Sequence, residues 1–114
     1  MALGLKMKSY LFDSTAGIRQ HETQNVDFDG RRILRDVHQR PILQAALAGF
    51  DIHFDNGDRP LNQVEVLLAD VGIVPGTSDT EAQATVNLLL RDASGHIDDP
   101  FSGVVNVLFI AEVA

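Results

Sequence analysis

The segment from Val104 to Val113 constrains the fold more than any other part of the sequence, because every second residue in it is apolar. The residues of this apolar side are Val105, Val107, Phe109, Ala111 and Val113. A period of two is typical of a β-strand with one buried face. Each large side chain that becomes fully buried contributes about 1.5 to 3 kcal/mol, so we expect this side to anchor a β-sheet core.

The opposite side of the same strand is also rich in hydrophobic residues. It carries Val104, Leu108 and Ile110 beside Asn106 and Glu112. Apolar side chains gathered on one exposed surface mark contacts between proteins. We therefore predict that Val104, Leu108 and Ile110 form the interface of a homo-oligomer.

A second strand is predicted from Ala84 to Arg91, where Ala84, Val86, Leu88 and Leu90 point the same way. A helix from Asp79 to Ala93 is an alternative, because Ser78 and Glu81 have the spacing of a helix capping box. We prefer the strand because the alternation fits it better. In addition, the strand at 104–113 needs an antiparallel neighbour.

Two further strands are predicted on either side of Asn56-Gly57, a turn signal because both residues tolerate positive φ. One lies within Ile42–Phe54, and the other spans Asn62–Val71. Lys8 to Phe12 can form a short strand, but residues 1–30 otherwise give no comparable signal, so an irregular N-terminal lead is expected there. The sequence thus predicts one mainly β domain over residues 1–114, with a sandwich core.

Composition limits the class of partner. The chain has 114 residues, the usual size of one domain, and its hydrophobic content of 45% is too high for a disordered chain. The net charge of -7 repels the phosphates of nucleic acids and anionic lipid surfaces, so neither nucleic acid nor membrane is an expected partner. A basic segment holds Arg31, Arg32, Arg35 and Arg40, a pattern typical of a solvated face that also favours self-association.

The chain contains no cysteine, which excludes disulfides and thiolate metal sites. It shows neither a signal peptide nor an apolar run of the roughly 18 residues that span a membrane. A soluble protein is expected, and its compartment stays open.

Two groups of acidic residues are candidate metal sites. Asp51, His53 and Asp55 alternate along one strand face, so their side chains could converge on a divalent ion. An outward polar strand face explains that pattern more simply. In the second group, the loop from Asp92 to Asp99, the oxygens of Asp92, Asp98 and Asp99 could bind calcium. Local turn hydrogen bonds explain the loop more simply, so we expect no cofactor and do not favour calcium.

An enzyme is not expected. The serines lack the setting of a nucleophile elbow, and the chain has no glycine-rich phosphate loop. A metal-dependent enzyme built on Asp51, His53 and Asp55 stays as the third hypothesis.

The layout from about Arg40 to Val113 resembles the H-type lectin domain. The resemblance rests on Arg40-Pro41-Ile42-Leu43 leading into an apolar strand, on the step Phe50-Asp51-Ile52, and on the strands at 62–71 and 104–113. It implies a six-stranded antiparallel β-sandwich that assembles into trimers or larger oligomers and binds galactosamine-type sugars. That family reads its sugar with an arginine of the middle strand and with aromatic or histidine side chains near the fifth. Residues 62–71 contain no arginine, and the stretch before Val104 has Phe101 and His96 but no tryptophan.

The leading hypothesis is a noncatalytic binding module, a trimer or hexamer, with a carbohydrate as the expected ligand. The predicted ligand-binding residues are Asp51, Asp58, Arg59 and His96, whose polar atoms would bond to sugar hydroxyls. The alternative is a structural or assembly subunit, such as an appendage or phage-like component, that binds no small molecule.

Overall fold

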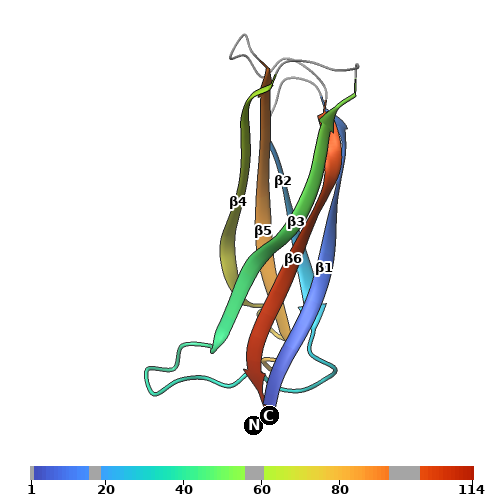
Figure 1. The fold of residues 1–114 in the computed structure, drawn as a ribbon. Helices are drawn as coiled ribbons and strands as arrows, with labels where there is room; N and C mark the ends of the chain where they lie inside the picture. The colour runs from blue at the N-terminus through green and yellow to red at the C-terminus, as the bar shows by residue number, and fades with distance from the viewer. Residues whose placement is uncertain (1, 16–18, 56–60, 93–100) are drawn as a thin grey trace.

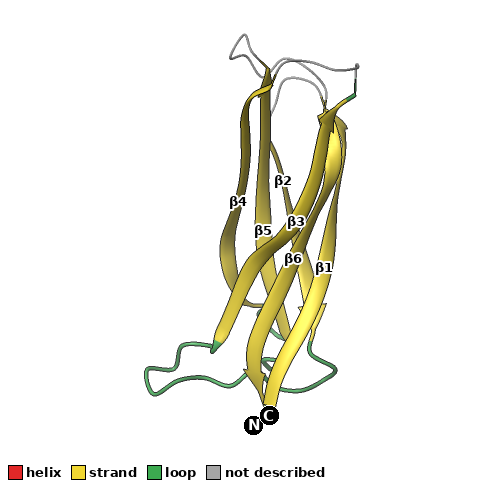
Figure 2. Ribbon diagram, in the orientation of Figure 1, coloured by secondary structure: helices red, strands yellow, loops and turns green. Residues whose placement is uncertain are grey.

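The computed structural model describes residues 2–15, 19–55, 61–92 and 101–114, and its regular structure is β throughout (Figures 1 and 2). The strands are β1 (Ala2–Thr15), β2 (Gln20–Asp27), β3 (Leu43–Phe54), β4 (Leu61–Ile73), β5 (Glu81–Asp92) and β6 (Phe101–Val113). They form two three-stranded antiparallel sheets, sheet A in the order β1-β6-β3 and sheet B in the order β2-β5-β4. The prediction of a mainly β, six-stranded antiparallel sandwich in one domain is confirmed.

The core lies between the sheets and is built on the alternating apolar faces of the two central strands. Val105, Val107 and Phe109 of β6 are fully buried, as are Val86 and Leu88 of β5. The faces predicted for both segments are therefore the faces that pack.

The pairing expected between these two segments is wrong, since β5 and β6 belong to different sheets. β5 lies between β2 and β4, and β6 lies between β1 and β3. The apolar face of a strand can pack against the opposite sheet of a sandwich. Alternating apolar residues in two segments therefore do not show that the segments pair within one sheet. The helix considered over residues 79–93 is also wrong: Ser78 occupies a turn with a φ of 56°, and β5 begins at Glu81.

The irregular lead expected over residues 1–30 is wrong too, because this segment forms β1 and β2. β1 pairs with β6 from Ala2 opposite Val113 to Phe12 opposite Gly103. β2 and most of β1 escaped prediction because their inward sides carry many polar residues. β1 places Lys6 and Lys8 there, and the half-buried polar residues of β2 are Gln20, Glu22 and Gln24.

The molecule is elongated, 50 × 24 × 21 Å, because its long strands run close to one axis (Figure 1). At one end, which we call the loop end, β1, β3 and β5 finish and β2, β4 and β6 begin. At the opposite end, the arm end, lie both chain termini and the segment between β2 and β3. The described ranges contain no helix of the length and apolarity that a membrane span requires.

Candidate binding surfaces

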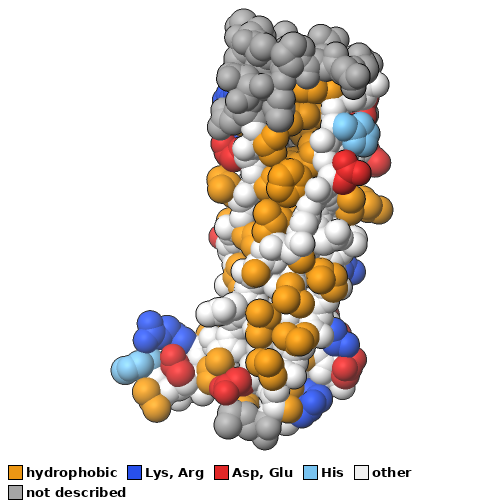
Figure 3. All heavy atoms as spheres, viewed as in Figure 1, with side chains coloured by type: hydrophobic (Ala, Val, Ile, Leu, Met, Phe, Trp, Pro, Cys, Tyr) orange, Lys and Arg blue, Asp and Glu red, His pale blue; other side chains and the backbone are white. Residues whose placement is uncertain are grey.

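The outer side of sheet A, which points away from sheet B, is largely apolar. Four outward side chains of β1 are exposed by 57% to 70%, and they are Leu3, Leu5, Met7 and Leu11. In the strand register, Leu5 lies opposite Ile110, Met7 opposite Leu108 and Leu11 opposite Val104. The three residues predicted as an interface thus share one surface with the four of β1, and we call these seven residues the apolar face. Figure 3, with sheet A nearer the viewer, shows hydrophobic side chains along the molecule and charged ones mostly at its margins.

The alternation along the first half of β1 is the reverse of that expected for a strand whose outer side meets water. Leu3, Leu5 and Met7 point outward, whereas Lys6 and Lys8 lie on the side that faces sheet B. The Lys6 side chain is partly exposed, and its Nζ lies 2.7 Å from the Asp29 Oδ1. Large apolar residues on the outer side are typical of strands that are covered on both sides. The outer side of β1 therefore has the composition of a covered strand face, although its large side chains are exposed in the single chain.

The residues that lie between members of the apolar face on the outer side of sheet A are uncharged. The Ser9 hydroxyl donates to the Asn106 Oδ1 at 2.7 Å, which satisfies both groups within the sheet. Charged residues stand at the two ends, with Glu112 opposite Leu3 and Asp51 opposite Val104. The surface between these ends can meet an apolar partner without desolvating a charge.

A polar cluster lies beside the apolar face at the loop end and consists of His53, Asp55 and Ser102. The Ser102 hydroxyl donates to the Asp55 Oδ1 at 2.5 Å, and the Ser102 Oγ lies 3.5 Å from the His53 Nε2. His53 Nε2 and Asp55 Oδ1 are 3.9 Å apart. Because the serine proton is directed at a carboxylate and not at an imidazole, the cluster differs from a serine nucleophile with a histidine base. Its exposed donors and acceptors suit hydrogen bonds to hydroxyl groups.

The predicted site residues fall into two groups. Asp51 is exposed on the outer side of β3, two residues before His53 and near the polar cluster. Outside the described residues lie Asp58, Arg59, His96, Asp98 and Asp99, together with the side chain of Asp92. Within the described ranges, no three Asp, Glu or His side chains gather closely enough to hold a metal ion. The geometry therefore gives no support to a metal centre on Asp51, His53 and Asp55.

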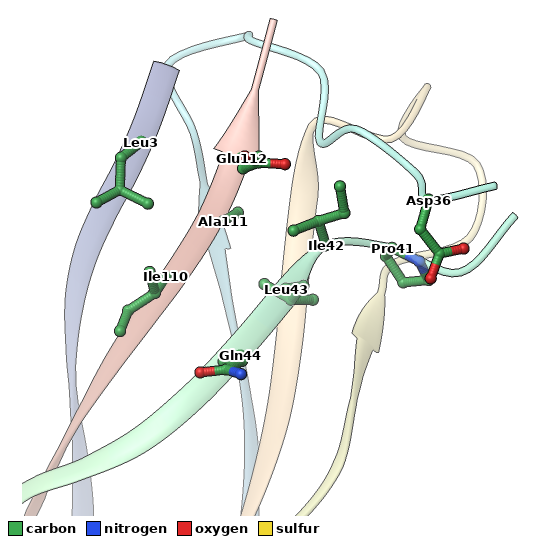
Figure 4. Close-up of a pocket in the computed structure, with 9 residues that line it drawn as sticks. All are labelled: Leu3, Asp36, Pro41, Ile42, Leu43, Gln44, Ile110, Ala111 and Glu112. Atoms are coloured by element: carbon green, nitrogen blue, oxygen red, sulfur yellow. The ribbon is translucent and has the colours of Figure 1, made fainter. Parts of the chain in front are cut away.

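A pocket of about 430 Å³ opens at the arm end of the apolar face (Figure 4). Its apolar walls are Leu3 from β1, Ile110 from β6, Leu43 at the start of β3 and Ile42 just before it. Glu112 and Asp36 each contribute a carboxylate to the same pocket, and Gln44 contributes an amide. The apolar face thus has a polar cluster near one end and, at the other, a hollow with both apolar and acidic walls.

Sequence reasoning missed Ser102 and the outward residues of β1. Ser102 reaches the cluster only through the pairing of β3 with β6, which places it opposite His53. The spacing of two between Leu3, Leu5 and Met7 is a strand signal, and it was available in the sequence. Comparisons with protein-family models, with curated proteins and with solved structures found no match to the chain.

Proposed function

We propose that this protein is a noncatalytic, self-assembling binding module whose copies pack through the apolar face and present the polar cluster to a carbohydrate. One observation carries the proposal: β1 exposes Leu3, Leu5, Met7 and Leu11, while Lys6 and Lys8 point toward the other sheet. Proteins that work as monomers rarely expose such a contiguous apolar surface. Burial against a partner converts it into a stabilising contact.

Another copy of the chain is the partner that the charge distribution favours. A net charge of -7 opposes association of two copies, and repulsion is smallest where the facing surfaces are uncharged. On the outer side of sheet A, the part between Glu112 at the arm end and Asp51 at the loop end is such an uncharged surface. The radius of gyration is 16.6 Å, larger than the about 13 Å typical of a compact domain of 100 residues. A single copy therefore exposes a large surface area relative to the volume of its core.

A carbohydrate is the ligand that best suits the polar cluster. His53, Asp55 and Ser102 offer both donors and acceptors, and Asp51 adds an exposed carboxylate on the same side of β3. Sugars present many hydroxyls, each of which both donates and accepts. The resemblance to H-type lectins supports this choice, because the six-stranded sandwich implied by that resemblance agrees with the observed fold. A trimer or hexamer is the assembly that follows from it.

A structural or assembly subunit is the second candidate, and it is favoured by the same apolar face. Under that reading the face would join copies and the polar cluster would bind no sugar. The two candidates therefore differ at the loop end only.

Association is tested with matched leucine variants that are read by sedimentation velocity. Leu5 and Leu67 are exposed by 57% and 52%, and they point outward from sheet A and sheet B respectively. The wild type should sediment as an oligomer, Leu5→Lys and Ile110→Lys should release the 12.4 kDa monomer, and Leu67→Lys should behave as the wild type. A monomeric wild type, or an oligomer that tolerates all three substitutions, would refute assembly through this face.

Sugar binding is tested by a glycan array followed by calorimetry, with and without calcium. Hits should be lost in His53→Ala and Asp51→Asn, and retained in Leu67→Lys. An oligomer that binds no sugar at millimolar concentration would favour the assembly subunit instead.

A further inference from the structure

The chain between β2 and β3 forms an arm, residues 34–42, that projects beyond the start of β3 at the arm end (Figure 1). Its tip carries Val37, whose side chain is 89% exposed, the largest exposed fraction among the large hydrophobic residues described. The single chain therefore does not bury this side chain. A contact with another copy would remove Val37 from water.

The tip is held in one conformation by Asp36. The Asp36 Oδ1 accepts hydrogen bonds from the backbone N–H groups of His38 at 2.8 Å and Arg40 at 3.0 Å. The backbone N–H of Asp36 donates to the Arg40 carbonyl oxygen at 2.8 Å. A turn that is already ordered loses little conformational entropy when it binds, so Val37 is presented as a preformed contact.

The base of the arm is also fixed, because it is tied to the end of β6. The N–H of Leu34 donates to the Glu112 carbonyl oxygen at 2.8 Å, and the N–H of Glu112 donates to the Ile42 carbonyl oxygen at 3.1 Å. The Arg35 guanidinium adds a bond from its Nε to the Asp79 Oδ2 at 3.1 Å. The direction of the arm relative to sheet A is therefore determined by the fold.

The two edges of sheet A are different in shape and chemistry. The β3 edge carries the arm and two partly exposed hydrophobic residues, Leu47 at 42% and Phe50 at 50%. The β1 edge carries four residues of the apolar face, of which Leu3 lies at the arm end. A contact between unlike edges is heterologous, and its repetition forms a ring when the rotation between copies closes and an open filament when it does not. If the ring axis runs along the strands, the arm of one copy is level with Leu3 of the next.

Charge favours the same arrangement. The segment from Arg31 to Arg40 holds four of the nine basic residues of an acidic chain. Arg40 is 73% exposed at the arm tip. Glu112 stands opposite Leu3 and lines the pocket beside it. Arg40 pairs with Asp36 of its own arm at 3.6 Å, and its exposed guanidinium has further N–H donors that a carboxylate of a neighbouring copy can accept from.

We infer that the copies assemble head to tail, with Val37 of each arm seated against Leu3 at the pocket of the next copy. This inference rests on the proposed self-assembly and specifies its geometry. In a ring of this kind, each arm contacts the apolar face of the next copy at the arm end. The polar clusters of all copies lie together at the loop end.

The absence of native cysteine allows a direct test by crosslinking between single-cysteine variants. Val37→Cys and Leu3→Cys proteins are dissociated, mixed, reassembled and treated with a short bismaleimide. A covalent pair containing one copy of each variant can form only between copies. The matched control replaces Leu3→Cys with Asn25→Cys, an exposed position on β2 in sheet B, paired with Gln83.

The expected result is a crosslinked Val37→Cys/Leu3→Cys heterodimer, with little product in the Asn25→Cys mixture. Val37→Asp should also weaken association about tenfold, the effect of losing one buried valine contact. An oligomeric wild type without the heterodimer, or with crosslinking only between two Val37→Cys copies, would overturn the head-to-tail geometry and leave the proposed function standing. A monomeric wild type would overturn both.

Discussion

The phenolic hydroxyl of Tyr10 donates a hydrogen bond to the carbonyl oxygen of Ala84, with 2.7 Å between the two oxygen atoms. Tyr10 belongs to β1 in sheet A and Ala84 to β5 in sheet B, and both residues are fully buried. The bond therefore joins the two sheets through the core. A buried hydrogen bond contributes about 1 kcal/mol net, so Tyr10→Phe should lower the free energy of unfolding by about that amount in chemical denaturation.

The same residue predicts a loss of stability at alkaline pH. Burial raises the pKa of Tyr10 from 10.0 to about 12. Between these values the folded chain keeps a proton that the unfolded chain has released, so stability falls as pH rises from about 10 to about 12. Tyr10→Phe should remove this part of the pH dependence.

Direct titration checks the pKa itself. Tyr10 is the one tyrosine of the chain, so the ultraviolet absorbance of phenolate reports on this group alone. A midpoint near 10 in the folded protein would contradict the buried environment.

Gly103 is required by the close approach of β3 to β6. A Cβ atom built on Gly103 would lie 2.2 Å from the Asp51 carbonyl oxygen and 2.8 Å from the Ile52 Cα. Both are backbone atoms, which cannot move aside as the end of a side chain can. Gly103→Ala should therefore lower the free energy of unfolding by about 1 to 3 kcal/mol.

Gly72→Ala is the matched control in thermal and chemical unfolding. Gly72 lies in β4, and a Cβ at that position meets no atom within 4 Å. Its substitution should change stability by no more than about 0.5 kcal/mol. Equal effects of the two alanines would show that the backbones of β3 and β6 lie farther apart.

The central strands could be predicted from the sequence because Val105, Val107 and Phe109 alternate without a break, and the core requires that pattern. Their pairing could not, since a buried face does not reveal whether its neighbour lies in the same sheet or in the opposite one. β1 was missed for a different reason. Its inward side combines Lys6 and Lys8 with Tyr10 and Phe12, so neither side of the strand reads as a core face over its whole length.

Part of the candidate site was likewise visible in the sequence. Asp51 and His53 share one strand face by spacing alone, and Leu108 and Ile110 stand out as apolar residues on an outer side. The hydrogen bond from Ser102 to Asp55 depends on pairing between segments 47 residues apart, which no local pattern encodes. The arm escaped prediction because its order comes from backbone bonds to Glu112 and from the bonds accepted by Asp36.

The ion pair between Arg35 and Asp79 should be visible in a carboxyl titration. The guanidinium donates from Nε to the Asp79 Oδ2 at 3.1 Å and from Nη2 to Oδ1 at 3.3 Å. These hydrogen bonds hold the pKa of Asp79 below its ordinary value of 3.8. The stabilisation is present above that pH and is lost as pH falls through the lowered pKa.

Carbon-detected NMR of the Asp79 carboxyl group provides the measurement. In Arg35→Gln the pKa of Asp79 should rise toward 3.8, whereas in Arg40→Gln it should stay low, because Arg40 pairs with Asp36. A pKa of Asp79 that is the same in the wild type and in Arg35→Gln would contradict the pairing.

The ion pair between Arg19 and Glu65 should be more strongly coupled than an ordinary surface pair. Leu89 points outward from sheet B and yet is fully buried. Its register partner in β4 is Glu65, and Arg19 precedes Gln20, the partner of Leu88 in β2. The pair therefore spans β5 over Leu89. Shielding of an apolar side chain removes water from the two charges, which strengthens their attraction.

A double-mutant cycle of Arg19→Ala and Glu65→Ala isolates this coupling from the other contacts of each residue. We expect about 1 kcal/mol, the upper end for surface pairs, decreasing with added salt. The comparison cycle uses Lys6 and Asp29, whose pair has an Asp29 side chain that is 76% exposed, and should give about 0.2 kcal/mol. Equal coupling in the two cycles would mean that water reaches Arg19 and Glu65 as freely as it reaches Asp29, and that Leu89 is shielded by other groups.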